Sequence, residues 1–123
     1  MICYDLRFPV WARSKKSKDQ SFEYDLLIYV ANWPDTRVNA WDALLKARAI
    51  ENQAYCAGVN RVGTDAFPKD YNGHSGVYAP KGDELVFSHQ DEAILTTTLS
   101  VEELISYRND FPFQNDADLF EIK

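Results

Sequence analysis

The sequence has 123 residues, 46% of them hydrophobic and 14% aromatic, which is typical of a globular chain and excludes a disordered one. Its formal net charge of −6 argues against nucleic acid as a partner, because phosphate binding requires a basic face. Two cysteines are too few for a secreted disulfide framework of this size. No apolar run approaches the length of about 20 residues that a membrane-spanning helix needs. We therefore expect the protein to be cytoplasmic.

The first half of the chain predicts two helices on either side of a strand. Residues 8–13 predict a short helix, because a proline is tolerated at a helix start. Residues 25–31 are almost continuously apolar, which is typical of a strand buried on both faces. A longer helix is predicted over residues 37–53, with Asp35 or Thr36 as its capping residue.

One face of the helix 37–53 combines apolar and polar residues. Trp41, Leu45, Arg48 and Asn52 share this face at helical spacing. Buried polar groups need partners, and Glu51 lies three residues after Arg48, within reach of its guanidinium. We therefore favour a structural polar network over a ligand site at these positions.

The middle of the chain predicts a strand, a loop and a hairpin. Residues 54–60 form the strand, which contains Cys56. Residues 62–73 contain glycine, aspartate and proline and predict a long loop of the kind that can border a site. Residues 76–79 and 84–88 predict the two strands of a β-hairpin.

The C-terminal part predicts one more strand and one more helix. Residues 94–99 are rich in threonine and predict the strand. Ser100 is positioned to cap a helix over residues 101–108, with Glu103 in the capping-box position, and an extended tail follows. The order of the elements predicts an α/β fold with a mixed sheet and helices packed on one face.

The first residues of the chain, Ile2-Cys3-Tyr4-Asp5-Leu6-Arg7-Phe8-Pro9, place a thiol at the end of an apolar strand, where the chain turns toward a helix. Helix amides near such a thiol favour the thiolate, which makes this a useful position for a nucleophile. Taken alone, Cys3 would more commonly be a buried structural cysteine. Only two residues precede it, whereas a strand takes about five, so we interpret the chain as the second part of a longer protein.

This segment resembles the nucleophile motif of the nitrilase superfamily of carbon–nitrogen hydrolases. Later blocks agree with that family in order and spacing, namely 32–34 with Arg37 and Trp41, then 44–53, 60–65 and 71–75. The tail is similar to the omega-amidase branch of the family at residues 107–113, Asp116, Asp118 and Phe120. That branch hydrolyses 2-oxoglutaramate-type amides.

The resemblance implies part of a nitrilase-type αββα sandwich. Residues 1–123 would be the C-terminal portion of a single carbon–nitrogen hydrolase domain. The family's Glu-Lys-Cys triad places its glutamate and lysine before the cysteine motif, so both would be missing here. We therefore expect an amidase that hydrolyses a small amide in its full-length form, with the isolated chain inactive. The alternative is a noncatalytic fragment that serves only in association with other chains.

The resemblance also assigns roles to residues. Cys3 would attack the amide carbonyl and form a thioester, and the backbone N–H of Tyr4 would donate to the oxyanion. Asn32 and Trp33 are substrate-binding candidates, although core packing is an equally good interpretation of Trp33. Arg7 is a third candidate that could bind a substrate carboxylate, and pairing with Asp5 is the favoured alternative.

Neither a metal nor another cofactor is expected. His74, His89, Cys3 and Cys56 show no pair at the short spacing of a zinc site. The expected partners are a small amide substrate and further copies of the chain in a homo-oligomer.

Overall fold

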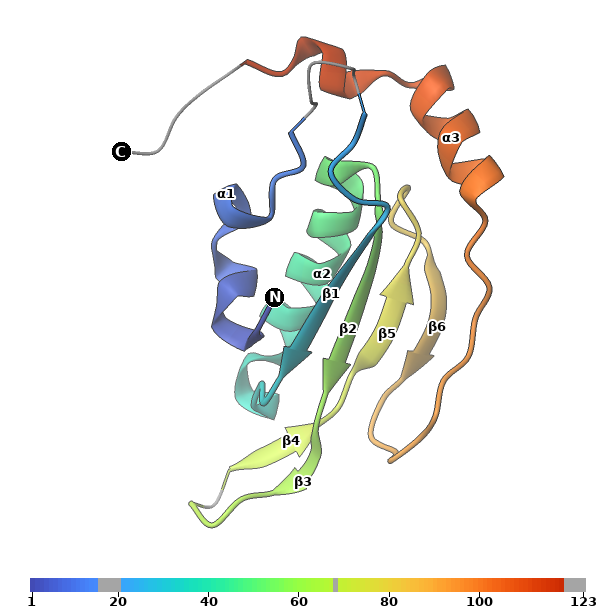
Figure 1. Cartoon of the computed structure of the whole chain (residues 1–123). Helices are drawn as coiled ribbons and strands as arrows, with labels where there is room; N and C mark the ends of the chain where they lie inside the picture. Colours follow the sequence, from blue (N-terminus) through green and yellow to red (C-terminus); the bar gives the residue numbers. More distant parts are fainter. Residues whose placement is uncertain (16–20, 68, 119–123) are drawn as a thin grey trace.

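The computed structural model describes residues 1–15, 21–67 and 69–118, and its centre is a four-stranded sheet in the order β1-β2-β5-β6 (Figure 1). Its strands are β1 (Leu26–Ala31), β2 (Tyr55–Asn60), β5 (Ser75–Tyr78) and β6 (Glu84–Ser88). β1 runs parallel to β2, whereas the β2–β5 and β5–β6 pairs are antiparallel. The predicted mixed sheet, the strand 54–60 and the hairpin are therefore confirmed.

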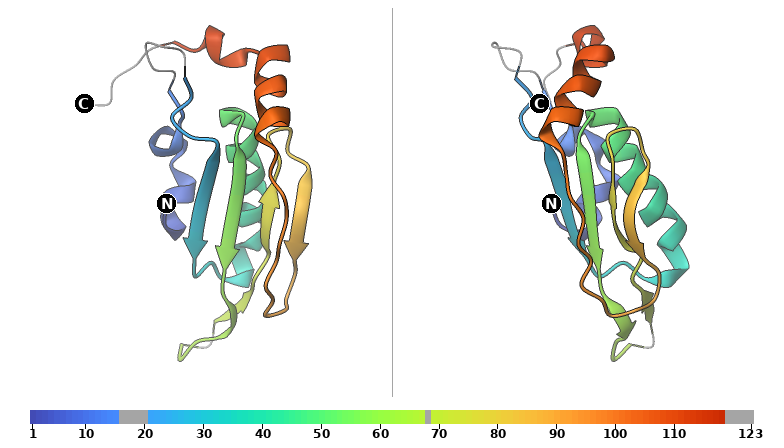
Figure 2. Two further views of the ribbon diagram at one scale, coloured as in Figure 1. Left: turned by 45° about the vertical axis from the view of Figure 1, so that its right-hand side comes forward. Right: turned by 90° about the vertical axis from the view of Figure 1, so that its right-hand side faces the viewer.

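The two predicted helices of the first half both form. Helices α1 (Pro9–Ala12) and α2 (Val38–Asn52) lie on the same face of the sheet (Figures 1 and 2). The predicted cap of α2 is wrong: Asp35–Arg37 forms a 3₁₀ turn first, so Arg37 occupies the N-cap position and no side chain caps the helix. Within the described residues, none of the helices has both the length and the apolar character that a membrane crossing requires.

Strand β1 is buried on one face only, so the prediction of burial on both faces is wrong. The residues that face the helices are Leu27, Tyr29 and Ala31, each at most 8% exposed. The residues that alternate with them are Leu26, Ile28 and Val30, which are 37%, 46% and 56% exposed. The reason is that α1 and α2 both cover the same face (Figure 2).

Close packing of α2 on the sheet depends on a glycine. A Cβ added to Gly58 of β2 would lie 2.3 Å from Leu45 Cδ1 and 2.7 Å from Trp41 Cζ2, closer than real Cβ contacts allow. Both side chains are fully buried. The absence of a side chain at Gly58 therefore lets the helix approach β2, next to the end of β1 where the candidate site lies.

The predicted polar network on α2 is confirmed. Arg48 Nη1 lies 2.8 Å from Glu51 Oε1, and its Nη2 donates to the carbonyl of Leu6. Asn52 Nδ2 donates to the carbonyl of Arg48 at 2.9 Å, and Asn52 Oδ1 accepts from the N–H of Ser14 at 2.9 Å. The network ties α2 to Leu6 in the cysteine motif and to Ser14 in the segment that follows, so its role is structural.

The segment 62–73 is not the predicted loop. β3 (Val62–Thr64) and β4 (Asp70–Asn72) pair in an antiparallel hairpin that extends from one end of the main sheet (Figure 1). Side chains close this hairpin, because Thr64 Oγ1 donates to Asp70 Oδ1 at 2.7 Å and Tyr71 Oη donates to Asp65 Oδ2 at 2.8 Å.

The C-terminal part differs from the prediction in two places. The predicted strand 94–99 is extended but pairs with no strand of the described residues. Helix α3 (Val101–Asp110) forms as predicted, and Ser100 Oγ accepts from the N–H of Glu103 at 3.1 Å. The tail is not fully extended, since Phe113–Asp116 forms a 3₁₀ helix. Phe120 lies outside the described residues.

Candidate active site

Cys3 lies where the first residues leave the sheet. Ile2 forms a parallel bridge with Val30 of β1, and a 3₁₀ helix, Cys3–Arg7, starts at the next residue. Asp5 fixes the turn: its N–H donates to the carbonyl of Ile2, and its Oδ2 accepts from the N–H of Ile2, both at 2.9 Å. The turn holds Cys3 at a φ of 36°, in a left-handed region that side-chain-bearing residues seldom adopt and that is over-represented at functional sites.

A small pocket of about 90 Å³ brings the predicted site residues together. Its lining comprises all five of them, Cys3, Tyr4, Arg7, Asn32 and Trp33, together with Pro34 and Arg37. The parallel bridge explains the convergence, because it brings the end of the first segment next to the end of β1. The Cys3 thiol is half-buried, and its Sγ lies 3.9 Å from the carbonyl oxygen of Asn32.

The backbone N–H of Tyr4 is available as a donor. It stands in the first turn of a 3₁₀ helix, where N–H groups have no partner within the helix. Among the residues that the structure describes, it makes no hydrogen bond. Tyr4 is 65% exposed, and its ring packs edge-on against Phe8 at a centroid distance of 5.2 Å. The N–H is thus next to the thiol and has no partner of its own.

Arg7 does not pair with Asp5, so that favoured alternative is wrong. The Asp5 carboxylate accepts from the N–H of Ile2 instead, and the Arg7 guanidinium lies over the Trp33 ring, 4.8 Å from its centroid. The stacking places a positive charge at the pocket.

Trp33 combines the two roles that were predicted as alternatives. It is only 3% exposed, and its ring packs against Trp41 at a centroid distance of 5.6 Å. Its Nε1 donates to the carbonyl of Arg37 at 2.8 Å, and the residue also lines the pocket. Trp33 is therefore a core residue that forms a rigid wall next to Cys3.

Asn60 holds this wall in place, although it is not among the predicted site residues. Its Oδ1 accepts from the Trp33 N–H at 2.7 Å, and its Nδ2 donates to the Trp33 carbonyl at 2.9 Å. The same Nδ2 donates to the carbonyl of Gly73 at 2.8 Å. The sequence signals were its place at the end of a predicted core strand and at the start of the family-like block 60–65, and neither reveals its partners.

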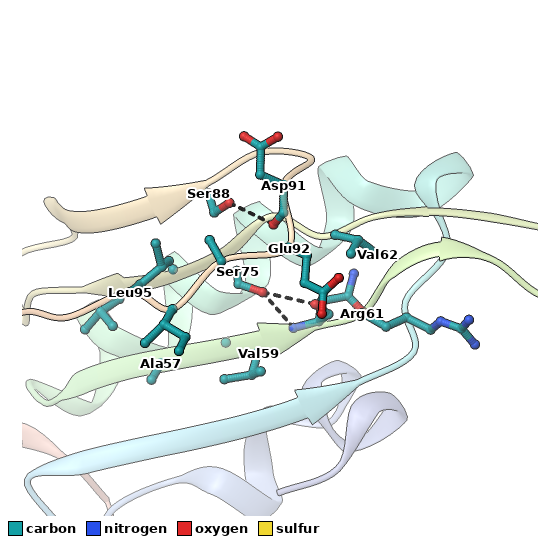
Figure 3. A pocket seen from close by; sticks show the side chains of 15 residues that line it. Ala57, Val59, Arg61, Val62, Ser75, Ser88, Asp91, Glu92 and Leu95 are labelled. Carbon is teal, nitrogen blue, oxygen red and sulfur yellow. Dashed lines mark hydrogen bonds between the residues drawn. The ribbon is translucent and has the colours of Figure 1, made fainter.

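A larger cavity of about 650 Å³ lies away from Cys3, on the face of the sheet opposite α2 (Figure 3). Ala57 and Val59 of β2 form its floor, and the extended segment around Leu95 crosses it. Ser75 Oγ lies in this cavity. It accepts a hydrogen bond from the N–H of Asn60 at 2.9 Å and donates one to the carbonyl of Asn60 at 3.1 Å. Cys3 does not line this cavity, so the candidate site is not in the larger of the two.

Metal-binding side chains do not gather in the part of the chain that the structure describes. The rings of His74 and His89 are neighbours, with centroids 5.2 Å apart, and His74 Nδ1 lies 2.8 Å from Asp42 Oδ2. Cys56 is fully buried in β2, where loss of hydration raises the pKa of its thiol to about 12. Its environment therefore disfavours the thiolate that a nucleophile needs.

Comparisons with known proteins agree on one family. The family model described as carbon-nitrogen hydrolase matches residues 1–109. Omega-amidase YafV from Escherichia coli K12 is 47% identical over 123 residues, covering 99% of this chain. The 2-oxoglutaramate amidase from Paenarthrobacter nicotinovorans is 37% identical over 123 residues, covering 98% of this chain.

A solved structure gives the same result for the fold. XC1258 from Xanthomonas campestris, described as a CN-hydrolase superfamily protein with an arsenic adduct in the active site, matches 100% of this chain with a TM-score of 0.97 and 42% identity. The chain spans about half the length of the proteins it matches: 46% of the E. coli protein, 40% of the P. nicotinovorans protein and 47% of XC1258.

Proposed function

The chain belongs to the carbon–nitrogen hydrolase family, and on that basis we propose that Cys3 is the nucleophile of an amidase that hydrolyses the C–N bond of a small amide. The family match and the likeness to XC1258 confirm the predicted resemblance and the nitrilase-type α/β fold. We further propose that residues 1–123 form the C-terminal portion of one such domain, with its glutamate and lysine located in the preceding portion.

The convergence of five predicted residues on one pocket is the observation that supports this function. They come from the 3₁₀ helix that starts at Cys3 and from the turn after β1, which are separate in sequence. A structural cysteine would need neither a pocket nor an adjacent unpaired N–H. In contrast, acyl transfer needs a nucleophile, an oxyanion donor and room for the reacting carbonyl, and a thiol, a backbone N–H and a small pocket lie together here.

The proposed reaction has two steps. The thiolate of Cys3 attacks the amide carbon, and the resulting oxyanion accepts a hydrogen bond from the N–H of Tyr4. The C–N bond breaks, ammonia leaves with one added proton, and a thioester remains on Cys3. Water then attacks the thioester, releasing the carboxylic acid and restoring the thiol. The general base that moves these protons would be the family's glutamate, which we place outside residues 1–123.

The proposed substrate is a small amide with a distal carboxylate, of which 2-oxoglutaramate is the first choice. Two named relatives, an omega-amidase and a 2-oxoglutaramate amidase, support this class. The guanidinium of Arg7 over Trp33 provides a positive charge beside the thiol, and Asn32 contributes a carbonyl to the same pocket. We propose a cytoplasmic homo-oligomer as the working form.

The test is ammonia release from 2-oxoglutaramate by the protein in its full coding context. Cys3→Ala should abolish turnover while the circular dichroism spectrum stays the same, and Cys56→Ala, the other thiol of the chain, should retain most of it. Turnover of Cys3→Ala within tenfold of the parent would reject the assignment. Preference for a nitrile or an N-carbamoyl amino acid would reject the substrate class.

The alternative is a noncatalytic fragment that acts only in association with other chains. The chain covers about half of each relative, which favours this alternative, because the proposed glutamate and lysine would then lie outside residues 1–123. A genuine start codon at Met1, with no upstream frame that encodes the glutamate and lysine, would support it.

A further inference from the structure

The pocket around Cys3 has a charge opposite to that of the protein. The chain carries a formal net charge of −6, yet the pocket lining contains two arginines, Arg7 and Arg37, and no carboxylate. An uncompensated pair of cations beside a reactive group favours a negatively charged ligand. The positive charge of the lining therefore favours an anionic ligand in this pocket.

The two arginines are held differently. The guanidinium of Arg7 is positioned over the Trp33 ring. Arg37 has its backbone fixed, since its carbonyl accepts from Trp33 Nε1 at 2.8 Å and its N–H donates to the carbonyl of Pro34 at 3.1 Å. Its side chain is exposed and, among the described residues, makes no hydrogen bond, ion pair or ring contact. The backbone of Arg37 is thus held in place, while its guanidinium has no partner among the described residues.

The acidic residues closest to the two arginines in sequence, Asp5 and Asp35, make no ion pair with them in the described part of the chain. Asp5 directs one carboxylate oxygen to the N–H of Ile2, and it does not line the pocket. Asp35 begins the 3₁₀ turn that contains Arg37 and does not line the pocket either.

We propose that Arg37 and Arg7 together form an anion-binding wall of the Cys3 pocket, which selects an electrophile that carries a carboxylate. This inference rests on the proposed function and assigns the recognition of the substrate's charge to Arg37, which the family motif did not. The volume of about 90 Å³ matches a group as small as a carboxylate, since one water occupies about 30 Å³ in the liquid.

The test uses two alkylating reagents of nearly equal size, anionic iodoacetate and neutral iodoacetamide. Each forms a bond from Cys3 Sγ to its CH₂ carbon and releases iodide, while the thiol proton goes to the buffer. Neither reaction requires turnover, so the 123-residue chain itself can be used. Peptide mass spectrometry measures alkylation at Cys3, and glutathione provides the reference ratio of the two rates.

We expect the ratio of iodoacetate to iodoacetamide rates to be higher at Cys3 than in glutathione. Arg37→Gln should lower it by about two- to threefold, as expected for loss of one charge within about 8 Å of the reagent in a largely aqueous setting. Arg37→Lys should retain most of the effect. Lys46→Gln is the matched control and should leave the ratio unchanged. Lys46 belongs to α2, and its side chain lies beside Gly82, which is in the turn between β5 and β6.

An Arg37→Gln ratio equal to that of the parent, with an unchanged circular dichroism spectrum, would overturn the proposal. A fall of equal size for Lys46→Gln would overturn it too, because the effect would then come from net charge. Hydrolysis is tested separately with the protein in its full coding context: Arg37→Gln should raise KM for an acidic amide and not for its neutral analogue. Absence of all hydrolysis in the parent would reject the proposed function and not the anion site.

Discussion

The buried amide of Asn60 joins three backbone groups behind the Cys3 pocket. It is 6% exposed and is hydrogen-bonded to both the N–H and the carbonyl of Trp33 and to the carbonyl of Gly73. Removing the amide would leave these backbone groups buried without partners. Unpaired buried groups cost more than the hydrogen bond itself was worth, because they have already lost their contact with water.

Asn60→Ala should therefore lower the free energy of unfolding by about 2–4 kcal/mol. Urea titration followed by tryptophan fluorescence measures the change. Asn39→Ala, at an exposed position of α2, is the matched control and should change stability by less than about 0.5 kcal/mol. Equal effects of the two substitutions would show that the amide of Asn60 does not fix Trp33.

The burial of the Cys56 thiol makes the stability of the fold depend on pH. Loss of hydration raises the pKa of Cys56 to about 12, although the positive charge of Arg48 acts in the opposite direction. In the unfolded chain the pKa of this thiol is at its ordinary value of 9.0. Between these values the unfolded state has lost the proton and the folded state keeps it, so stability falls as pH rises.

We expect the free energy of unfolding to fall by about 1.4 kcal/mol for each pH unit above pH 9 through Cys56 alone. The pKa of Tyr29 is also raised to about 12 by burial, which adds to the slope above pH 10. Urea titrations at pH 8, 9 and 10 measure the slope. Cys56→Ala should make it shallower between pH 9 and 10, and an unchanged slope in this variant would contradict the assignment.

At the scale of elements, local sequence patterns were sufficient where an element depends on its own residues. The amphipathic spacing of α2, the Ser100 cap of α3 and the β5–β6 hairpin are all readable within a few residues. The β3–β4 hairpin was missed, because side-chain pairs such as Tyr71 with Asp65 close it across a segment that reads as a loop. The strand predicted at 94–99 has suitable residues and no partner strand among those described.

The candidate site shows the same limit. Its residues could be named from the motif that begins at Ile2, whereas its geometry depends on contacts between distant segments. Asn60 reaches Trp33 across 27 residues, and the Arg37 carbonyl is fixed by a tryptophan ring. Local sequence patterns do not reveal contacts between distant segments, which is why Asn60 and Arg37 were not predicted as parts of the site.

One arginine, Arg108, makes three of the polar contacts that attach α3 to the rest of the chain. Arg108 Nη1 lies 2.6 Å from Asp25 Oδ1, its Nε donates to the carbonyl of Gln53 at 2.9 Å, and its Nη2 donates to the carbonyl of Tyr24 at 3.1 Å. Leu104 is the one residue of α3 that is fully buried. Since so little apolar surface of α3 is buried, its attachment relies on these polar contacts.

Arg108→Ala should release α3 from the entry to β1 without unfolding the sheet. Loss of hydrogen bonds from a charged donor corresponds to about 2–3 kcal/mol, so amide exchange in Val101–Asp110 should accelerate by about 30- to 150-fold. Lys81→Ala, which removes a cation near the Tyr107 ring, should have a much smaller effect. Unchanged exchange in α3 of Arg108→Ala would show that other contacts hold the helix.

For the molecule as a whole, the most consequential property is the sheet face opposite α1 and α2. Ile28 and Val30 of β1 and Val59 of β2 are 46%, 56% and 52% exposed on it. Apart from the bridge between Ile2 and Val30, the outer edge of β1 pairs with no strand of the described residues. Apolar faces and open strand edges both promote association between chains.

We therefore expect the 123-residue chain, produced alone, to self-associate through this face and to hydrolyse amides far more slowly than the about 1–10³ per second of ordinary enzymes. Size-exclusion chromatography with light scattering measures the first property, and ammonia release measures the second. Ile28→Lys should shift the chain toward the monomer, because an ammonium group in a newly formed apolar interface would lose its hydration without a partner. Ile105→Lys, at a 52% exposed position of α3, is the matched control and should not. A monomeric parent chain with ordinary turnover would show that the face needs no cover and that a general base lies within these 123 residues.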